Sequence, residues 1–376
     1  MKICMVMSTP FPPCDGIGYH VYSLARELQK KGHEITVLTR SNALGEETAW
    51  FEGIRIIRGP FLPTYPFHIS THGIWTNSRF NGLVNEFQVI HYHIPLVPRL
   101  KSSAPTVVTV HSSMIEEMNQ MESTFFLKKM ALQGMTKTFT KHYMNEILTS
   151  SDSIIAVSSS VRDELVKYFS IERKINVIWN GVDTDFFIPS TSRENQDYIL
   201  YTGRLGYRKG LIELIDAFKI ISEKTDCNLV LSGRGPLREM LEKRVREYGL
   251  EKRVRFAGFV ERDALLRLYQ GAHIFVAASS YETGPLTALE AMSCAVPIVV
   301  TRVGILPDVV QDGVTGLFVK KQDSKDIAEK CLSLLSDKSR SLTMGKKARE
   351  FVEIHCTWSK VGNEVEKIYS RLIQDR

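Results

Sequence analysis

The sequence contains no cysteine pair at Cys-x-x-Cys spacing and no apolar run long enough to cross a bilayer. Its six cysteines are scattered, and several lie in apolar runs. This usage is typical of reduced core residues in a cytosolic protein, and it argues against a disulfide framework or a zinc ribbon. The short apolar run Lys2–Met7 is followed by no small-residue cleavage site, so it predicts a strand rather than a signal peptide.

Blocks of lysine or arginine are also missing, although the formal net charge is +6. Proteins that bind nucleic acid usually carry such a cluster, so the sequence argues against a nucleic-acid partner. The mild positive excess suits anionic ligands or an anionic membrane surface. The cysteine usage and the lack of a signal-peptide pattern predict a cytoplasmic location, and the positive charge leaves peripheral contact of the N-terminal domain with the inner face of the cell membrane as an alternative.

Apolar, strand-like runs alternate with amphipathic helical stretches along nearly the whole chain, which is the pattern of doubly wound, Rossmann-like α/β domains. A length of 376 residues fits two domains better than one core. The polar segment Ile188–Asp197 has no apolar period, so the domain boundary is predicted there. The predicted parts are domains 1–187 and 198–356, and a helix over 357–376 that packs on the first domain. Two such domains facing across a cleft would bind ligands at the carboxyl ends of their strands.

Strands and helices follow from these runs. In the first domain we predict strands at 2–7, 34–39, 54–57, 88–92, 106–111, 153–157 and 175–179, with helices at 18–31, 125–148 and 159–168. In the second domain we predict strands at 198–202, 228–232, 253–256, 274–277, 297–300 and 316–319.

The turn after the first predicted strand reads Asp15-Gly16-Ile17-Gly18. Small residues let the backbone approach a ligand there, and the N-terminus of the following helix attracts phosphate. A dinucleotide-binding turn needs a third glycine, but Val21 stands in its place. The second strand ends at Thr39-Arg40, without an acidic residue for a ribose. The pattern argues against a dehydrogenase, and a tight turn without a ligand is the alternative.

A basic, glycine-containing loop, Tyr201–Gly210, follows the first strand of the second domain. Arg204 can bind phosphate oxygens through its guanidinium fork, and Lys209 supplies a point charge near a helix start. Two cations so placed would stabilise a departing diphosphate without a metal. A solvated basic loop is the alternative interpretation.

Glu282 and Glu290 have seven residues between them. Glu282 comes just after an apolar strand, Pro285 opens a helix, and Glu290 lies inside that helix among apolar residues. A carboxylate in such surroundings needs a partner. Sugar or ribose hydroxyls would serve, and pairing with an arginine such as Arg302 is the alternative.

With these motifs, the sequence resembles the group 1 (family 4) retaining glycosyltransferases of the GT-B fold. The matching segments run in order through nearly the whole chain: Gly16–Gly18, Ile90–His93, Val107–His111, Ser151–Ser158, Asn180–Phe187, Gly203–Gly210, Gly233–Pro236, the Glu282/Glu290 pair, and Asp312–Gly316. Thr357–Ser359 resembles the point at which the family's last helix crosses back to the first domain.

The resemblance implies roles for individual residues. Glu282 and His111 are the expected catalytic residues, which contact the transferred sugar. Glu290 is expected to hold the ribose hydroxyls of the donor, and Arg204 and Lys209 its diphosphate. The remaining expected donor-binding residues are Gly16, Gly18, Gly284, Leu286 and Thr287. Two positions depart from the family pattern: Asp15 stands where relatives often have glycine, and Pro285 offers no N–H, so a sugar preference cannot be carried over.

The implied activity is transfer of a hexosyl or N-acetylhexosaminyl group, with retention, from a nucleotide-diphosphate sugar to a glycan, lipid-linked or small-molecule acceptor. The first domain would bind the acceptor and the second the donor. Electrostatic stabilisation of the leaving diphosphate would be the main protein contribution, so no cofactor and no metal are expected. A nucleotide-sugar epimerase of the same architecture and a non-catalytic nucleotide-sugar-binding protein are the alternatives.

Three further patterns in the sequence are weaker indications of function. Asp183–Asp185 mimics a metal motif but matches a family turn, so a structural role is favoured. His91 and His93 alternate on a strand and could form a zinc site with His111; without an acidic partner, two histidines lining the cleft, or one there and one in the core, are favoured. The basic and apolar segment 125–143 predicts a core-packed helix, with a membrane-surface helix as the alternative.

Overall fold

The computed structural model describes residues 1–13, 15–41, 45–61, 68–83, 85–119, 126–171, 173–191 and 198–376. These residues form two compact units. The first unit contains the described residues up to 119, those of 126–180, and Trp358–Arg376. The second contains the described residues of Gly181–Thr357. Each unit is built around a parallel sheet, as the alternation of apolar runs predicted.

The first unit contains β1 (Lys2–Met7), β2 (Glu34–Arg40), β3 (Glu47–Phe51), β4 (Ile54–Gly59), β5 (Val89–Ile94), β6 (Thr106–Val110), β7 (Ser153–Ala156) and β8 (Ile175–Val177). They form one sheet in the order β3-β4-β2-β1-β5-β6-β7-β8, in which only β3 and β4 pair antiparallel. Its helices are α1 (Gly16–Lys30), α2 (His68–Asn81), α3 (Ile115–Asn119), α4 (Phe126–Ser150), α5 (Ser159–Phe169) and α13 (Trp358–Gln374).

The second unit contains β9 (Tyr198–Thr202), β10 (Asn228–Ser232), β11 (Val254–Gly258), β12 (Ala272–Ala277), β13 (Ile298–Thr301) and β14 (Gly316–Val319). All pair parallel, in the order β11-β10-β9-β12-β13-β14. Its helices are the 3-10 turn η1 (Tyr207–Lys209), α6 (Leu211–Ser222), α7 (Arg238–Glu247), α8 (Arg262–Gln270), α9 (Leu286–Ser293), α10 (Leu306–Val309), α11 (Ser324–Ser336) and α12 (Lys338–His355).

Both sheets have buried strands because helices cover them. In the first unit, strand residues such as Ile90 and Val108 pack with Phe80 of α2 and Leu165 of α5. The core of the second unit joins its sheet to α6, α7 and α11 in the same way. Strands covered on their faces read as continuous apolar runs, which is why the sequence revealed most of them.

The order of strands reverses beside the first strand of each sheet. β1 lies between β2 and β5, and β9 lies between β10 and β12. In open parallel sheets, ligands bind outside the carboxyl ends of the strands at such a reversal. The carboxyl ends of β1 and β5, and of β9 and β12, are therefore the positions where functional residues are expected.

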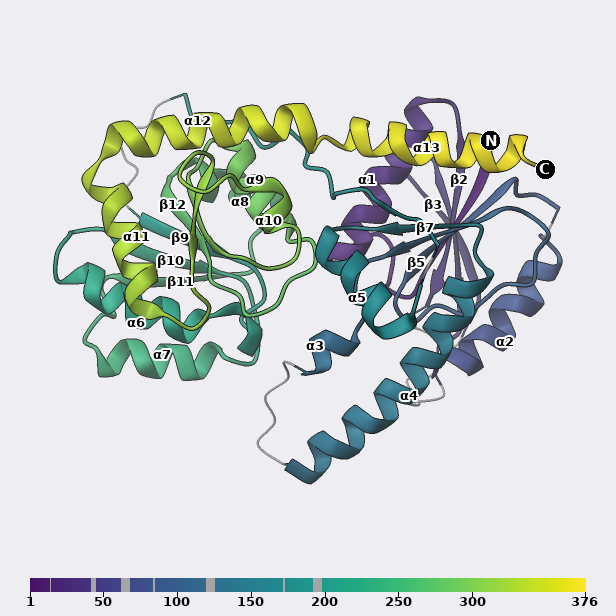
Figure 1. The fold of residues 1–376 in the computed structure, drawn as a ribbon, viewed down its shortest axis with the longest axis horizontal. Helices are drawn as coiled ribbons and strands as arrows, with labels where there is room; N and C mark the ends of the chain where they lie inside the picture. Colours follow the sequence, from purple (N-terminus) through teal and green to yellow (C-terminus); the bar gives the residue numbers. More distant parts are fainter. Residues whose placement is uncertain are drawn as a thin grey trace. The chain divides into compact units, whose positions relative to one another are not determined.

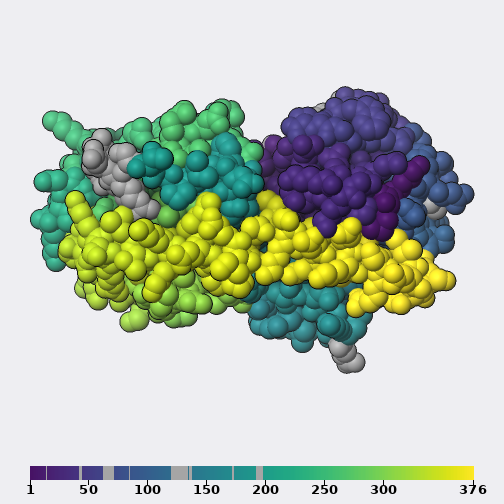
Figure 2. Space-filling model, turned by 90° about the horizontal axis from the view of Figure 1, so that it is seen from above, coloured from purple at the N-terminus to yellow at the C-terminus, as the bar shows by residue number. Residues whose placement is uncertain are grey.

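The C-terminal helix α13 belongs to the first unit and runs along α1 (Figure 1). The Glu366 carboxylate accepts hydrogen bonds from Lys31 Nζ, at 2.7 Å, and from the His33 ring, at 2.8 Å. A side chain at Gly362 would approach Glu27 to 3.0 Å, so the two helices pack closely at this glycine. In Figure 2 the yellow surface of α13 adjoins the purple surface of the amino-terminal segment. The return of the last helix to the first unit agrees with the expected fold.

Residues 181–187, which the sequence assigned to the first domain, belong instead to the second unit. The Val182 N–H donates to the Cys356 carbonyl, and Arg349 donates to the carbonyl of Phe187. These bonds fasten the segment to α12 of the second unit before the predicted linker begins. Part of that linker lies outside the described residues.

Three elements of the first unit were not predicted, namely β3, α2 and the short α3; nor were α11 and α12, which follow the last strand of the second unit. Most of β3 is solvent-exposed, so it lacks the apolar run that marks a buried strand. The α2 sequence has little amphipathic character. Phe125 and most side chains of 126–137 lie outside the described residues, so the nature of that basic helix stays a prediction. Among the helices that the structure describes, none is long and apolar enough to span a membrane.

Candidate active site

A glycine brings the loop after β9 onto the end of β12. Gly210 has a φ of +64°, and a Cβ there would lie 2.0 Å from the carbonyl oxygen of Ala278. Only glycine allows this approach. The Ser280 N–H also donates to the Arg208 carbonyl, at 2.8 Å. Both contacts hold η1, and with it Lys209, beside the loop that follows β12.

Lys209 and Glu282 form an ion pair across these two loops. The ammonium donates to Glu282 Oε1 at 2.5 Å, and the Ser279 hydroxyl donates to the same oxygen at 2.8 Å. The side chains are 25% and 13% exposed, so solvent screens the pair less than it screens a pair on the open surface. From the sequence, Lys209 was assigned to the diphosphate and Glu282 to the sugar. The structure brings these two predicted groups into direct contact.

Arg204 stands in contrast to Lys209 in the same loop. Its side chain is exposed, and no ion pair involves it among the residues that the structure describes. Its carbonyl accepts a hydrogen bond from the buried Tyr201 hydroxyl, at 2.9 Å, which fixes the backbone. Besides Arg208, whose guanidinium lies over the Tyr281 ring, the loop therefore holds one paired cation, Lys209, and one guanidinium open to an anion, Arg204.

Glu290, on α9, is held by a chain of buried hydroxyls. The Tyr269 hydroxyl donates to Glu290 Oε2 at 2.8 Å, and it is linked to the Thr202 hydroxyl at 2.7 Å. Burial raises the pKa of Glu290 to about 7, although the Tyr269 hydrogen bond and the charge of Arg262 act to lower it. A large fraction of this carboxyl is therefore protonated at neutral pH.

Arg302 is not the partner of Glu290, contrary to the alternative raised from the sequence. Its guanidinium donates to Asp312, at 3.1 Å, and lies over the Phe318 ring. No sequence pattern pointed to the partner that Glu290 does have, because Tyr269 lies on a different helix.

The remaining predicted donor-binding residues of this unit form the start of α9. Pro285 is the N-cap residue of α9, and no side chain caps the helix. The first N–H groups of a helix have no partner within it. Those of Leu286 and Thr287, which follow Gly284 and Pro285, are therefore suited to an anion or a hydroxyl oxygen.

In the first unit, the predicted phosphate turn has a cap of its own. The Asp15 carboxylate accepts the N–H of Gly18, at 2.8 Å, and so occupies one of the groups that a phosphate would use. A Cβ on Gly18 would lie 3.1 Å from Pro13 Cα, whereas one on Gly16 would meet nothing within 4 Å. Gly18 therefore packs tightly against Pro13, and Gly16 adjoins open space.

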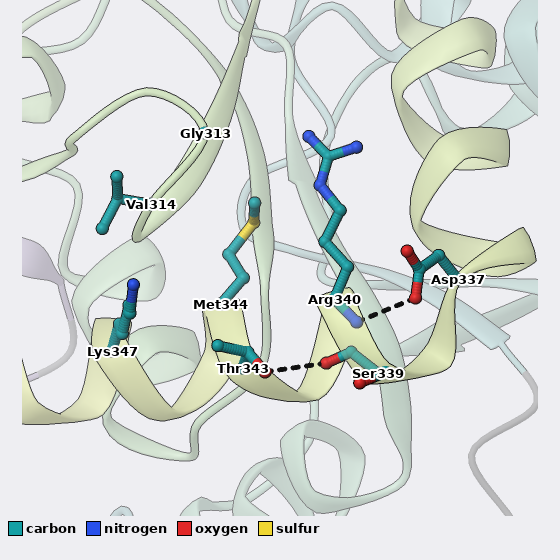
Figure 3. A pocket seen from close by; sticks show the side chains of 8 residues that line it. All are labelled: Gly313, Val314, Asp337, Ser339, Arg340, Thr343, Met344 and Lys347. Atoms are coloured by element: carbon teal, nitrogen blue, oxygen red, sulfur yellow. Dashed lines mark hydrogen bonds between the residues drawn. The ribbon is translucent and has the colours of Figure 1, made fainter.

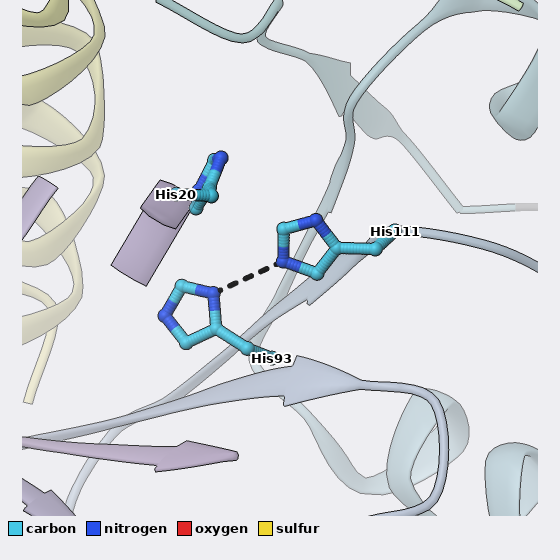
Figure 4. A group of neighbouring side chains, drawn as sticks. All are labelled: His20, His93 and His111. Carbon is cyan, nitrogen blue, oxygen red and sulfur yellow. Dashed lines mark hydrogen bonds between the residues drawn. The ribbon is translucent and has the colours of Figure 1, made fainter. Parts of the chain in front are cut away.

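Three buried histidines gather beside this turn, as Figure 4 shows. His20 comes from α1, His93 from β5, and His111 directly follows β6. The His93 and His111 rings are linked at 3.3 Å, and His20 is linked to the Asn180 side chain at 2.9 Å. Burial lowers the pKa of His20 to about 4 and holds the pKa values of His93 and His111 well below their usual range. All three rings are therefore neutral at pH 7.

These histidines differ from the trio considered as a zinc site from the sequence. His91 lies in the core, where Tyr369 and Thr109 occupy both of its ring nitrogens, at 2.6 and 2.7 Å. His20 joins His93 and His111 instead, with candidate ligand nitrogens that all lie within 4.8 Å of one another. Neutral imidazole is the form that binds metals, so this cluster is the one place among the described residues where histidines could share an ion.

A separate cavity of about 310 Å³ lies in the second unit, between α12 and the Gly313-Val314 turn (Figure 3). Arg340, Met344 and Lys347 contribute to its lining. It contains none of the predicted site residues, and the Asp337 side chain already caps α12 through the Arg340 N–H, at 2.9 Å. We assign no role to it.

Models of known protein families match both units of the chain. The family model described as glycosyl transferases group 1 matches residues 183–351, and that of Glycosyltransferase Family 4 matches residues 14–186. The chain belongs to the group 1 glycosyltransferases. It is therefore a transferase, as the resemblance of its motifs implied.

Relatives of this glycosyltransferase cover nearly the whole chain. A glycosyltransferase of Methanocaldococcus jannaschii is 29% identical, over 98% of both chains. A human protein, which forms part of phosphatidylinositol N-acetylglucosaminyltransferase, is 28% identical, over 99% of this chain and 76% of the human one. Among solved structures, sucrose-phosphate synthase from Thermosynechococcus elongatus has a TM-score of 0.84 at 23% identity, over 100% of both chains. The Anabaena protein HepE, in complex with UDP-glucose, has a TM-score of 0.76 at 16% identity, over 99% and 100%. The fold of this glycosyltransferase is GT-B.

Proposed function

We propose that this glycosyltransferase transfers a hexosyl or N-acetylhexosaminyl group from a nucleotide-diphosphate sugar, with retention and without a metal. The second unit binds the donor and the first unit the acceptor. The observation that carries the proposal is the gathering of Arg204, the Lys209–Glu282 pair and Glu290 around the strand-order reversal of the second sheet. The Anabaena neighbour solved with UDP-glucose and the human N-acetylglucosaminyltransferase support this donor class.

Donor binding requires an exchange of partners in the second unit. Arg204 takes the diphosphate first, because its guanidinium has no competing carboxylate among the described residues. Lys209 binds a second phosphate oxygen by leaving Glu282. The released Glu282 then accepts a hydrogen bond from a hydroxyl of the transferred sugar, and Glu290 accepts hydrogen bonds from the ribose. Each polar group thus exchanges one partner for another and is never left unpaired.

The reaction breaks the bond between the anomeric carbon and the diphosphate oxygen. Negative charge grows on that oxygen, so Arg204 and Lys209 interact with the transition state more strongly than with the bound donor. The acceptor hydroxyl attacks from the same face and gives its proton to the leaving phosphate, and the new glycosidic bond keeps the anomeric configuration. His111, whose buried ring is neutral, offers a hydrogen bond to the sugar rather than a charge.

The proposal is tested with the purified protein. A thermal-shift screen of nucleotide-sugars identifies the donor, because a ligand that binds the folded state raises stability by mass action. A coupled assay then follows release of nucleoside diphosphate with a panel of acceptors, and NMR of the product gives its anomeric configuration. We expect release only with an acceptor, with a retained product, and with a large loss in Glu282→Ala. Donor conversion without diphosphate release would identify an epimerase, binding without turnover would identify a non-catalytic binder, and an inverted product would refute retention.

A further inference from the structure

His111, the predicted catalytic histidine of the first unit, is bonded through one of its two ring nitrogens. Its Nε2 is linked to His93 Nδ1 at 3.3 Å, as the dashed line in Figure 4 shows. Its Nδ1 has no hydrogen-bond partner among the described residues, and it is not one of the enclosed atoms that lack a partner. Nδ1 is therefore the nitrogen of His111 that can reach a ligand.

The pairing of two parallel strands places these rings side by side. His93 of β5 pairs with Thr109 of β6, and paired residues of parallel strands have their side chains on the same face of the sheet. His111 comes two residues after Thr109, so its side chain lies on that face too. The His111 N–H donates to the Ile94 carbonyl, at 3.0 Å, which continues the pairing beyond the end of β6. The strand register thus sets the contact between the two rings.

The second nitrogen of His93 indicates which ring donates the hydrogen bond. Among the described residues, three buried side-chain atoms have no hydrogen-bond partner, and they are Thr9 Oγ1, Arg40 Nε and His93 Nε2. The His93 side chain is completely buried. Burial also holds the pKa values of His93 and His111 well below their usual range, so each ring is neutral and carries a single N–H.

The hydrogen bond between two neutral rings can be made in two ways. If His111 Nε2 donated, the proton of His93 would lie on Nε2 and would be a buried N–H without an acceptor. Buried N–H groups without a partner are rarer in proteins than acceptors with an unused lone pair. The other arrangement leaves only a lone pair unused, because His93 Nδ1–H donates and His111 Nε2 accepts. The proton of His111 then lies on Nδ1, the nitrogen that can reach a ligand.

We propose that His93 is a positioning residue that fixes His111 as the Nδ1–H tautomer and so makes it a hydrogen-bond donor to an oxygen of the transferred sugar. The tautomer of a histidine is set by the hydrogen bond that its other nitrogen makes. A neutral histidine side chain in water prefers its proton on Nε2, so without His93 the ring would present a lone pair to the ligand. The inference rests on the proposed function, because it defines how His111 acts in that reaction.

Long-range proton–nitrogen NMR correlation spectra of protein with isotope-labelled histidine measure the tautomers directly, without donor or acceptor. The signals of His111 are identified by their loss in His111→Gln. At neutral pH we expect the Nδ1–H pattern for His111 in wild type and the Nε2–H pattern in His93→Leu. His93→Asn, whose amide nitrogen can take the place of Nδ1, should retain the Nδ1–H pattern. His91→Gln is the matched control, because His91 lies on the same strand and bonds through both ring nitrogens to Tyr369 and Thr109.

Steady-state kinetics connect the tautomer with the reaction. In His93→Leu, kcat/KM should fall about tenfold, which is the upper scale for one lost neutral hydrogen bond. His93→Asn should recover most of this loss, because it restores the donor to His111 although it packs no better than leucine. A role of His93 in packing alone would give the opposite order of the two variants.

The tautomer and its catalytic consequence are tested separately. An Nε2–H pattern for His111 in wild type would overturn the proposal, and so would a folded His93→Leu protein in which His111 keeps the Nδ1–H pattern. A change of tautomer in His91→Gln as well, or a changed tautomer in His93→Leu with unchanged kcat/KM, would overturn the positioning role. Should His93→Leu fail to fold, His93→Phe takes its place with the same expectations. Because the spectra are recorded without substrates, failure of the tautomer assignment is distinct from failure of the sugar-transfer assay.

Discussion

The carboxyl edges of the two sheets satisfy their polar groups in opposite ways. In the second unit, Lys209 is paired with Glu282, and Glu290 with Tyr269. In the first unit, three buried polar atoms are unbonded among the described residues. A paired edge must exchange its bonds when a ligand arrives, whereas an edge with unbonded groups gains bonds. Donor binding should therefore be sensitive to the internal partners.

The two units also differ in how pH acts on them. The first unit buries four neutral rings, those of His20, His91, His93 and His111. The second holds Glu290 near its ionisation point at neutral pH. A pH change should therefore alter the stability of the first unit and the ligand affinity of the second.

The largest expected effect is acid unfolding of the first unit. Burial depresses the pKa of all four histidines, to about 4 for His20 and about 3 for His91, so the folded unit binds fewer protons than the unfolded chain once the pH falls below about 6.5. Stability is therefore present above pH 6.5 and is lost as the pH falls toward 4. Each ring contributes at most about 1.4 kcal/mol per pH unit, so the four together approach about 5 kcal/mol per pH unit.

Tryptophan fluorescence isolates this effect, because all four tryptophans (Trp50, Trp75, Trp179 and Trp358) belong to the first unit. In urea titrations between pH 7.5 and pH 5, the fluorescence midpoint should fall steeply. The far-UV circular dichroism signal, which reports on both units, should be lost in two steps as the urea concentration rises. A fluorescence midpoint that is independent of pH would contradict the burial of neutral histidines.

Lys209→Ala should give the next largest effect. Loss of one preorganised charged donor typically lowers turnover roughly a hundred- to a thousandfold. Arg204 and the α9 N-terminus would still hold the donor, so its affinity should change less than turnover. Steady-state kinetics measure the first quantity and calorimetry the second. Lys243→Ala is the control, because Lys243 is exposed and its contact with Glu247 is a surface pair at 3.8 Å. If turnover of Lys209→Ala stayed within about twofold of wild type, the assignment of Lys209 to the catalytic site would be wrong.

Donor affinity should show a smaller effect: below pH 7 it should fall about tenfold per pH unit as Glu290 becomes protonated. Ribose hydroxyls donate to the ionised carboxylate, whereas the protonated carboxyl has lost acceptor capacity. Because the pKa of Glu290 is about 7, affinity should be full above pH 7 and should fall as the pH drops below it. The intact nucleotide-sugar is the proper probe, because its diphosphate does not titrate in this range. In Glu290→Gln the dependence should vanish.

Tyr269→Phe refines the same measurement. Its hydroxyl lowers the pKa of Glu290, so its removal should move the midpoint of donor affinity to higher pH. Tyr198→Phe is a matched control, since the Tyr198 hydroxyl donates to the Leu268 carbonyl, at 2.7 Å. Equal midpoints in both variants would mean that the Tyr269 hydroxyl does not set the ionisation of Glu290.

The sequence predicted the sheets better than it predicted the contacts between side chains. Buried strands such as β1 and β9 are apolar runs, so their positions can be read directly, whereas the exposed β3 carries no such signal. The spacing of Glu282 and Glu290 predicted one in a loop and one on a helix. It could not predict that Lys209 neutralises Glu282, because that contact joins loops 73 residues apart. For the same reason the sequence did not identify His20 as part of the buried histidine cluster, because its position there depends on how α1 packs.

The smallest effect is the one expected from metal removal, which should leave turnover unchanged. Arg204 and Lys209 supply the positive charge for the diphosphate, so a divalent ion has no charge left to neutralise. The competing possibility is a transition metal held by His20, His93 and His111, whose neutral rings have the protonation state that such an ion requires. Dialysis against EDTA, followed by assay with and without added magnesium or zinc, decides between them. Elemental analysis of the untreated protein, set against a His20→Gln variant, shows whether this cluster holds an ion at all. If turnover were lost in EDTA and restored by magnesium, the proposal that Arg204 and Lys209 replace a metal would be wrong. If zinc were bound by wild type and absent from His20→Gln, only the expectation that the histidine cluster holds no metal would be wrong.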